Sequence, residues 1–283
     1  MGVRTSPTER QRRLGAELKR MRLSADVSAE TAAGLLRVDR SRLSQMEQGY
    51  RGISIDRLLT LACNCECADE AYVKALSAMA EPNQRGWWDR YRGSLPAGLL
   101  DIAELEAHSP HLRTALAVHI PGLLQTFDHA LAVFGVAVPQ LPDRELAMRL
   151  EFRIERQQVL EGATPARYTG IVHEAALRMQ FGGTQVAKAQ LEHLLRKSEQ
   201  DNIAILAIPF SAGAFPGSGQ TLTYAEGPVP QLDTVQVDST HGPEYLHGEA
   251  QLAKYRAHLD WMEKITLSPQ GTRDLIHSIA QEL

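Results

Sequence analysis

Two short helical segments separated by three residues constrain this chain more than any other feature. Ser28 is a good N-cap for a helix over residues 28–36, and Asp39 is a good N-cap for a second helix that runs to Gln48. The connection between them is Arg-Val-Asp. A turn of about 3–4 residues between two helices is typical of a helix-turn-helix unit.

The second of these helices has a narrow apolar seam and a broad polar surface. Leu43 and Met46 are three residues apart and therefore share one face. The other positions carry mainly Arg, Ser and Gln, and Gly49 ends the helix in the manner of a C′ glycine. We expect Leu43 and Met46 to pack on the neighbouring helices, which leaves the polar surface for a partner.

Three further amphipathic helices accompany this pair. An i, i+4, i+7 pattern of Leu14, Leu18 and Met21 predicts a helix over residues 8–23, and a last helix is expected over 69–80. Ser54 caps the fourth helix of the set, whose expected inward-facing residues are Ile55, Leu58, Leu59 and Ala62. The sequence thus predicts an all-α domain of five helices within residues 1–81.

Charge divides the chain into two unequal parts. Residues 1–67 contain 12 Lys and Arg against 8 Asp and Glu, whereas residues 68–283 contain 18 against 26. A small basic region ahead of a longer acidic one indicates that the first part meets a polyanion and the second does not.

Several classes of protein find no support in the sequence. No apolar run approaches the ~18 residues of a membrane span, and the polar N-terminus MGVRTSPTERQRR lacks the apolar region of a secretory signal. VHEAALRM begins like a zinc-hydrolase motif, but Leu177 stands where the second histidine is required. We expect no catalytic residues and no cofactor, and therefore no enzyme.

The three cysteines, Cys63, Cys65 and Cys67, are spaced too closely for a zinc site. An odd number of cysteines fits a reducing cytoplasm, which is the expected location. We interpret the three thiols as small structural groups and expect no bound metal, with metal binding or redox sensing as the alternative.

Residues 14–18 and 39–49, with the core Ser-x-Leu-Ser-x-Met-Glu-x-Gly, resemble the phage-repressor (XRE) class of helix-turn-helix domains. The resemblance implies that the helix starting at Arg40 enters the DNA major groove, which accepts one helix. It also implies that Glu47 pairs with an arginine of the first helix, here Arg22.

The same resemblance assigns contacts to DNA. The residues expected at base edges are Arg40, Ser41 and Gln45. The residues expected at phosphates are Ser28, Arg42, Ser44 and Arg51. Ala29 stands where many relatives carry a polar residue that reaches a phosphate, so fewer contacts are expected there.

Residues 82–283 show a mixed pattern. Helices are expected at 98–108, 121–135, 142–161, 184–199, 247–264 and 269–281. Strands are expected at 114–120, 167–173, 202–209, 221–225 and 233–238. Because the strands come late and close together, we predict an α+β domain with a mostly antiparallel sheet packed by helices.

Three segments of this second domain resemble an antitoxin-like family of XRE-type regulators from streptomycetes and their relatives. They are HIPGLLQT (119–126), IVHEAALRMQFGG (171–183) and AIPFSAGAFPG (207–217). Relatives usually carry an acidic residue where His173 stands. We interpret PGLLQT as a strand-to-helix corner with Leu123 and Leu124 in the core, and direct contact with a ligand is the alternative.

The resemblance implies a sequence-specific transcriptional regulator, with repression as the expected mode. It further implies a homodimer on a pseudo-palindromic, double-stranded operator and a small partner protein encoded by a neighbouring gene. The alternative is a regulator whose second domain senses a small-molecule ligand. An enzyme with a DNA-binding head would need a convergent set of catalytic groups, which the sequence does not show.

Overall fold

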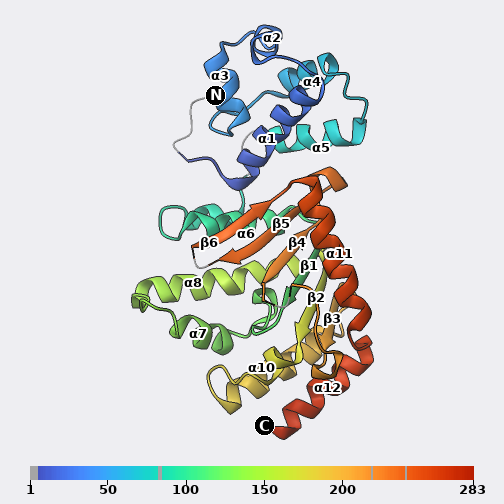
Figure 1. Cartoon of the computed structure of the whole chain (residues 1–283). Coiled ribbons are helices and arrows are strands. Elements are labelled where there is room, and N and C mark those ends of the chain that lie inside the picture. The colour runs from blue at the N-terminus through green and yellow to red at the C-terminus, as the bar shows by residue number, and fades with distance from the viewer. Residues whose placement is uncertain (1–5, 82–84, 218, 240) are drawn as a thin grey trace. The chain divides into compact units, whose positions relative to one another are not determined.

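The computed structural model of the chain describes residues 6–81, 85–217, 219–239 and 241–283 (Figure 1). Contacts divide the chain into two compact units, Met1–Arg90 and Tyr91–Leu283. The domain border expected between residues 81 and 82 falls beside residues 82–84, which lie outside the described residues. Within the described ranges, no helix is both long and apolar enough to cross a membrane.

The first unit contains the five predicted helices. They are α1 Glu9–Ser24, α2 Ala29–Leu35, α3 Arg40–Glu47, α4 Ile55–Asn64 and α5 Glu70–Ala80. The side chains of Ser28, Asp39 and Ser54 each accept a backbone hydrogen bond at the start of α2, α3 and α4. All three predicted N-caps are therefore confirmed.

Helix α4 turns a different stripe inward from the one expected. Leu58 and Ala62 are buried as predicted, but Ile55 and Leu59 are 38% and 47% exposed. Leu61 takes the place of Leu59, and Ile53, just before the helix, fills the core position expected of Ile55. The buried stripe of α4 therefore runs through residues 58, 61, 62 and 65, and it is rotated around the helix axis relative to the expected stripe.

Helices α1 and α3 approach each other so closely that only glycine fits between them. A Cβ atom at Gly15 would lie 2.6 Å from the carbonyl oxygens of both Met46 and Glu47. Gly49, with φ of +81°, is equally enclosed, since a Cβ there would lie 2.7 Å from the carbonyl oxygen of Gln11. These two contacts fix the position of α3 against α1.

The second unit is built on a six-stranded mixed sheet with strand order β3-β2-β1-β4-β5-β6. The strands are β1 His111–Leu116, β2 Arg167–His173, β3 Ile203–Ile208, β4 Leu222–Ala225, β5 Thr234–Ser239 and β6 Gly242–Leu246. Strands β1, β2 and β3 are parallel, and the three remaining pairs are antiparallel. The predicted α+β class is confirmed, although β1 lies earlier than the expected 114–120 and β6 was not predicted.

In the described part of the second unit, seven α-helices accompany this sheet. They are α6 Ala97–Ala107, α7 Phe127–Gly135, α8 Asp143–Arg156, α9 Glu174–Arg178, α10 Thr184–Lys197, α11 Glu249–Ile265 and α12 Pro269–Glu282. The helix predicted over 121–135 is wrong at its start. Residues Gly122–Leu124 form a 3-10 turn, Gln125 is extended, and α7 begins after the N-cap Thr126.

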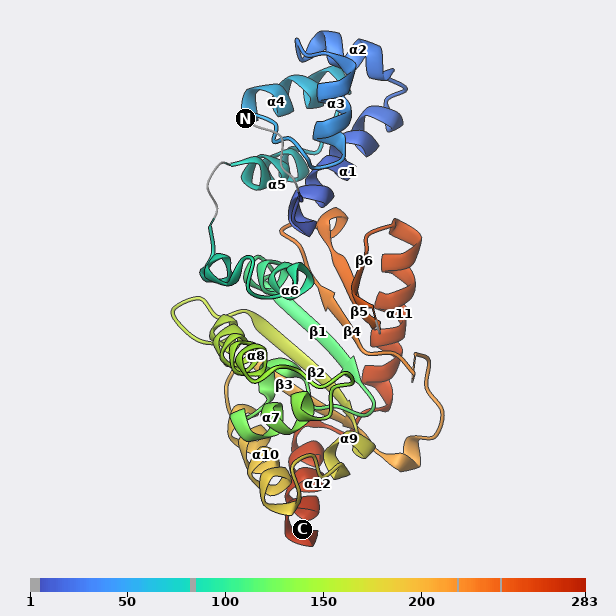
Figure 2. The ribbon, with the colours of Figure 1, turned by 90° about the vertical axis from the view of Figure 1, so that its left-hand side faces the viewer.

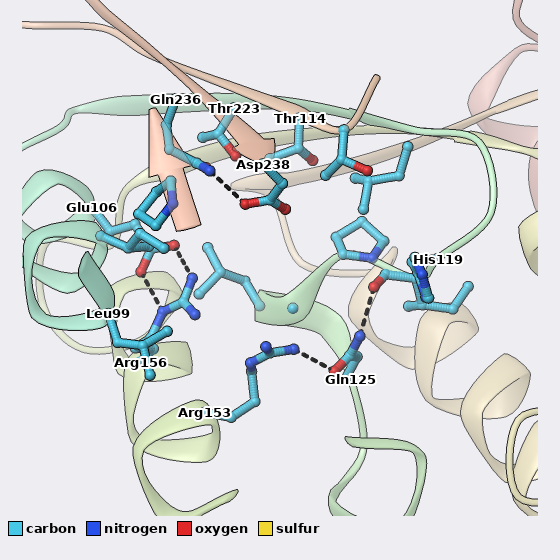
Figure 3. A pocket seen from close by; sticks show the side chains of 18 of the residues that line it. Leu99, Glu106, Thr114, His119, Gln125, Arg153, Arg156, Thr223, Gln236 and Asp238 are labelled. Carbon is cyan, nitrogen blue, oxygen red and sulfur yellow. Dashed lines mark hydrogen bonds and ion pairs between the residues drawn. The ribbon is translucent and has the colours of Figure 1, made fainter. Parts of the chain in front are cut away.

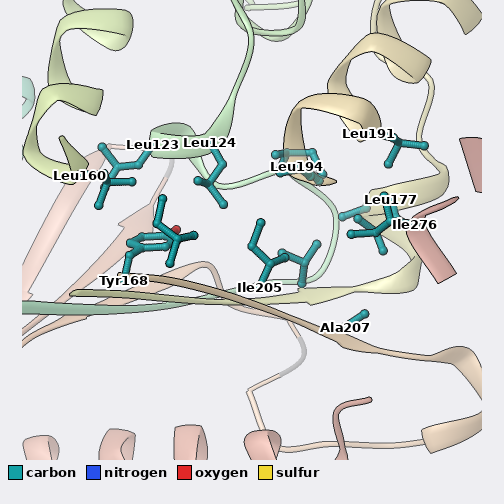
Figure 4. Packing of buried hydrophobic residues seen from close by; sticks show 14 of the residues in the cluster. Leu123, Leu124, Leu160, Tyr168, Leu177, Leu191, Leu194, Ile205, Ala207 and Ile276 are labelled. Atoms are coloured by element: carbon teal, nitrogen blue, oxygen red, sulfur yellow. The ribbon is translucent and has the colours of Figure 1, made fainter. Parts of the chain in front are cut away.

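Helices cover both faces of the sheet (Figure 2). On one face, α10 and α12 pack with the 122–124 turn against Leu112, Tyr168 and Val172 (Figure 4). On the other face, Leu252, Leu259 and Met262 of α11 pack against apolar residues of β1 to β5. Arg113 also points to this second face, where its guanidinium pairs with Asp260 and Glu263 of α11 at 2.7 and 2.9 Å. Both faces are therefore covered over the central strands, whereas Asp238 at the end of β5 and Glu244 of β6 remain exposed.

Replacement of Gly15 by alanine is expected to destabilise the first unit by about 1–3 kcal/mol, because the new methyl group overlaps two backbone carbonyls that cannot move aside. Gly34 provides a matched control, since it also lies in a helix but a Cβ there meets no described atom within 4 Å. Gly34→Ala is expected to stabilise by about 0.5–1 kcal/mol. Denaturant unfolding of the full chain, followed by circular dichroism, measures both. Equal unfolding midpoints for the two variants would contradict the close approach.

Candidate nucleic-acid interface

Helix α3 separates the residues that hold it from those that face outward. Leu43 and Met46 are buried, whereas Arg40, Ser41, Arg42 and Ser44 are exposed and Gln45 is partly exposed. The residues expected at base edges, Arg40, Ser41 and Gln45, therefore all retain accessible surface on this helix. Their contact with DNA stays a prediction.

A buried ion pair ties the end of α3 to α1. The guanidinium of Arg22 donates to both carboxylate oxygens of Glu47, at 2.7 and 3.2 Å, and also to the carbonyl oxygen of Val27 at 2.9 Å. Each of the two charged side chains is only 7% exposed. The hydrogen bond to Glu47 raises the pKa of Arg22 above its usual value. The pairing expected from the resemblance is confirmed.

The residues expected at phosphates differ in their surroundings. Ser28 is exposed, and its hydroxyl accepts the backbone N–H of Thr31 at 3.0 Å as the cap of α2. The hydroxyl of Ser44 accepts a hydrogen bond from the Gln48 amide at 3.1 Å. Arg42 is exposed, with its backbone N–H bound by Asp39. The Ser28 hydroxyl also lies 2.8 Å from the Thr31 hydroxyl, and either of the two can donate to the other. The bonds given for Ser44 and Arg42 use the Ser44 oxygen as acceptor and the Arg42 backbone, so they leave the Ser44 hydroxyl hydrogen and the Arg42 guanidinium available to a phosphate.

Arg51 and Gln45 lie in direct contact, which the sequence did not reveal. The Arg51 Nε donates to the Gln45 Oε1 at 3.2 Å, and the Arg51 backbone N–H donates to the Gln45 carbonyl at 3.0 Å. Arg51, which is expected to contact a phosphate, thus orients Gln45, which is expected to contact a base. In the sequence, the contact is indicated only by the six-residue spacing between Gln45 and Arg51, and that spacing brings the two together only if the turn at Gly49 folds the chain back.

The cysteines do not share one environment. Cys65 is buried at the end of α4, and burial raises the pKa of its thiol. Cys67 is partly buried and Cys63 is exposed. The structural role expected of the three thiols stays a prediction. Within the ranges the structure describes, no group of three His, Cys, Asp or Glu side chains could hold a metal ion.

The HEAAL and PFSAG segments of the second unit meet at the carboxyl ends of β2 and β3. The Glu174 carboxylate accepts the backbone N–H of Phe210 at 2.9 Å and pairs with Arg178. The ring of His173 lies against Phe210 and Phe215, with its Nδ1 accepting the N–H of Ala175 as the cap of α9. A carboxylate at this position would accept the same N–H as the cap of α9.

The PGLLQT segment forms the predicted corner. Leu123 and Leu124 are buried in the core, and the Gln125 amide donates to the carbonyl oxygen of Ile120 at 2.8 Å. A Cβ atom at Gly122 would lie 3.0 Å from the guanidinium of Arg153. The corner interpretation is confirmed, and the same segment forms one wall of a cavity in the second unit.

Comparison with known protein families agrees with the division into a helical first unit and a larger second unit. The helix-turn-helix domain family matches residues 13–71, which indicates a DNA-binding regulator. The family described as a domain of unknown function (DUF5753) matches residues 99–278, more than half of the chain. The chain belongs to this DUF5753 family. No curated protein and no solved structure matches it.

Replacement of Glu47 by alanine is expected to cost about 3–5 kcal/mol in unfolding free energy, because it leaves the Arg22 guanidinium buried without a counter-charge. Arg12→Ala is the control, since its ion pair with Glu9 leaves Arg12 45% exposed and is expected to contribute less than about 1 kcal/mol. Guanidinium denaturation of the full-length variants compares the two. A Glu47→Ala protein as stable as Arg12→Ala would show that the pair does not hold α3.

Proposed function

We propose that this chain is an XRE-type, sequence-specific transcriptional regulator that reads double-stranded DNA with helix α3. One observation carries the proposal. Leu43 and Met46 are buried and the Glu47 side chain is 7% exposed, whereas Arg40, Ser41, Arg42 and Ser44 of the same helix are exposed. The basic balance of residues 1–67 adds an attraction to polyanions.

In this proposal, base-edge contacts come from Arg40, Ser41 and Gln45. An arginine can grip guanine O6 and N7, and a glutamine can grip adenine N6 and N7. Phosphate contacts come from Ser28, Arg42, Ser44 and Arg51 and position the domain on the duplex.

The active form in this proposal is a cytoplasmic homodimer on a pseudo-palindromic operator, acting as a repressor. A single recognition helix covers only a few base pairs, and dimers of this class bind half-sites about 34 Å apart. The acidic second unit binds a small, basic partner protein in the antitoxin-like manner that the family resemblance implies. Complementary charge favours such a pair through faster and more selective association.

The alternative role is the sensing of a small molecule by the second unit. A cavity in that unit, lined by both polar and apolar side chains, favours it.

Substitutions on α3 test the reading of DNA. Arg40→Ala and Gln45→Ala are each expected to lose about 1–3 kcal/mol on an operator selected from random duplexes, with relaxed preference at one base pair. Arg42→Ala is the control on the same helix, since a lost phosphate contact weakens binding to every sequence and lowers the salt slope by about 1. Fluorescence anisotropy on operator and random duplex measures all three.

Arg51→Ala is expected to weaken binding to every sequence and also to relax the preference at one base pair, because Arg51 contacts Gln45. The double variant with Gln45→Ala should then lose less than the sum of the two single losses. If Arg40→Ala and Gln45→Ala lose as much affinity on random DNA as on the operator, as the control Arg42→Ala is expected to do, then α3 does not read bases.

A calorimetric titration tests the partner. The full chain is expected to bind the small protein encoded beside its own gene, and operator DNA is expected to change that affinity by the factor by which the small protein changes affinity for the operator. Titrations with and without operator, at two salt concentrations, provide both factors. Absence of binding, or binding that DNA does not alter in either direction, would remove the partner from the proposed function.

A further inference from the structure

A cavity of about 320 Å³ lies within the second unit, between the sheet and its helices (Figure 3). Strands β1, β4 and β5 contribute one wall, and α6, the 119–125 segment and α8 contribute the others. Its volume lies at the lower end of the range for small-molecule sites, about 300–1,000 Å³.

The sheet presents an unusual row of polar side chains to this cavity. Along β4 and β5, Leu222, Tyr224 and Val235 point to the α11 side and pack in its core. The alternate residues, Thr223, Gln236 and Asp238, line the cavity. An apolar row would be expected on an interior face if the helices simply packed against it. Gln236 of this row is buried, Thr223 is partly buried and Asp238 is exposed, so the polar row runs from the inside of the cavity to its open side.

Two arginines of α8 enter the cavity from the opposite wall, and they differ in their partners. Arg156 forms a double hydrogen bond with the Glu106 carboxylate, at 2.5 and 2.9 Å, which balances its charge. Arg153 donates to the neutral Gln125 amide oxygen at 2.6 Å and lies over the ring of Phe134, 4.7 Å from its centre. Among the described residues, no carboxylate lies within ion-pair distance of Arg153.

The guanidinium of Arg153 carries its positive charge inside this cavity. Burial and the neighbouring charge of Arg156 lower the pKa of Arg153 to about 9, so the group remains protonated at neutral pH. Gly122 leaves space for the guanidinium, because a side chain there would begin 3.0 Å from it. The carboxylates of Glu106 and Asp238 oppose this shift only in part. A buried charge without a direct ion-pair partner is costly, and an anion bound beside it would reduce that cost.

Asp238 supplies the complementary group across the cavity (Figure 3). Asp238 is exposed at the open side of the cavity, where its carboxylate accepts from the Gln236 amide at 2.6 Å and has no ion-pair partner within the described part of the chain. Between the two charges, the walls are apolar, with Leu99 and Ile102 from α6 and Ile120 and Leu123 from the corner segment. The cavity thus offers a cation, an apolar middle and a hydrogen-bond acceptor.

We propose that this cavity binds a small organic acid that carries a hydroxyl or amino group, with its carboxylate on Arg153, its apolar part against α6, and its donor on Asp238. This proposal deepens the second of the two proposed roles, ligand sensing. Its test uses the full chain without DNA, so that its failure leaves the reading of DNA by α3 untouched.

The test uses 3-phenyllactate, its uncharged amide, and 3-phenylpropionate, which lacks the hydroxyl group. Millimolar 3-phenyllactate is expected to raise the melting temperature of the full chain, and calorimetry is expected to show at least tenfold weaker binding of the amide. 3-Phenylpropionate is expected to bind several-fold more weakly than the hydroxy acid, and this preference should vanish in Asp238→Ala.

Arg153→Gln is expected to lose at least tenfold in affinity for 3-phenyllactate. Its unliganded form should melt at or above the temperature of the wild type, because a charge without a counter-ion has been removed. Arg149→Gln is the matched control on the same helix, where Arg149 pairs with Glu145 at 2.6 Å, and its affinity should be unchanged.

Three outcomes would overturn the proposal. The first is that the acid and its amide bind equally or not at all. The second is unchanged affinity in Arg153→Gln. The third is an Arg153→Gln protein that melts well below the wild type, which would assign Arg153 to holding the fold.

Discussion

The sheet of the second unit has helices against both of its faces, and most of that unit's structure follows from this constraint. A strand covered on both sides directs most of its side chains into the protein, where buried polar groups need hydrogen-bond partners. On the α11 side, apolar packing and the Arg113 ion pairs provide those partners. On the other side, apolar packing fills the region under α10 and α12, while the polar residues of β4 and β5 line a cavity.

The helical unit depends on a different constraint, the close contact of two backbones. Because Gly15 lets α3 lie directly on α1, the Arg22–Glu47 pair can form in a buried place where its geometry is defined. The ion pair and the N-cap Asp39 then fix the two ends of an eight-residue helix. A short helix gains little stability from its own hydrogen bonds, so these tertiary contacts decide where its polar surface points.

Local signals made much of this fold predictable. The caps Ser28, Asp39 and Ser54, together with apolar periodicity, located the helices of the first unit, and the family resemblance supplied the Arg22–Glu47 pair. Contacts between distant segments were not predictable. Pro121 indicates a helix start, but burial of Leu123 and Leu124 delays the helix to Phe127. The alternation of polar and apolar residues in β5 is the same whether the polar face meets water or helices, so the sequence alone did not predict the cavity. The Arg51–Gln45 contact was not predictable because it depends on the path of the turn at Gly49.

Because only a few side chains of α3 are buried, its exposed positions can change sequence more freely during evolution. Folding depends on Leu43, Met46 and Glu47, whereas the side chains at positions 40, 41 and 44 are exposed and make few contacts within the unit. Surface substitutions of this kind usually change stability by less than about 0.5 kcal/mol. The outward positions can therefore drift between generations with little effect on folding. If α3 reads DNA as proposed, related chains can acquire new target sequences through these positions while the rest of the fold, including the cavity, stays unchanged.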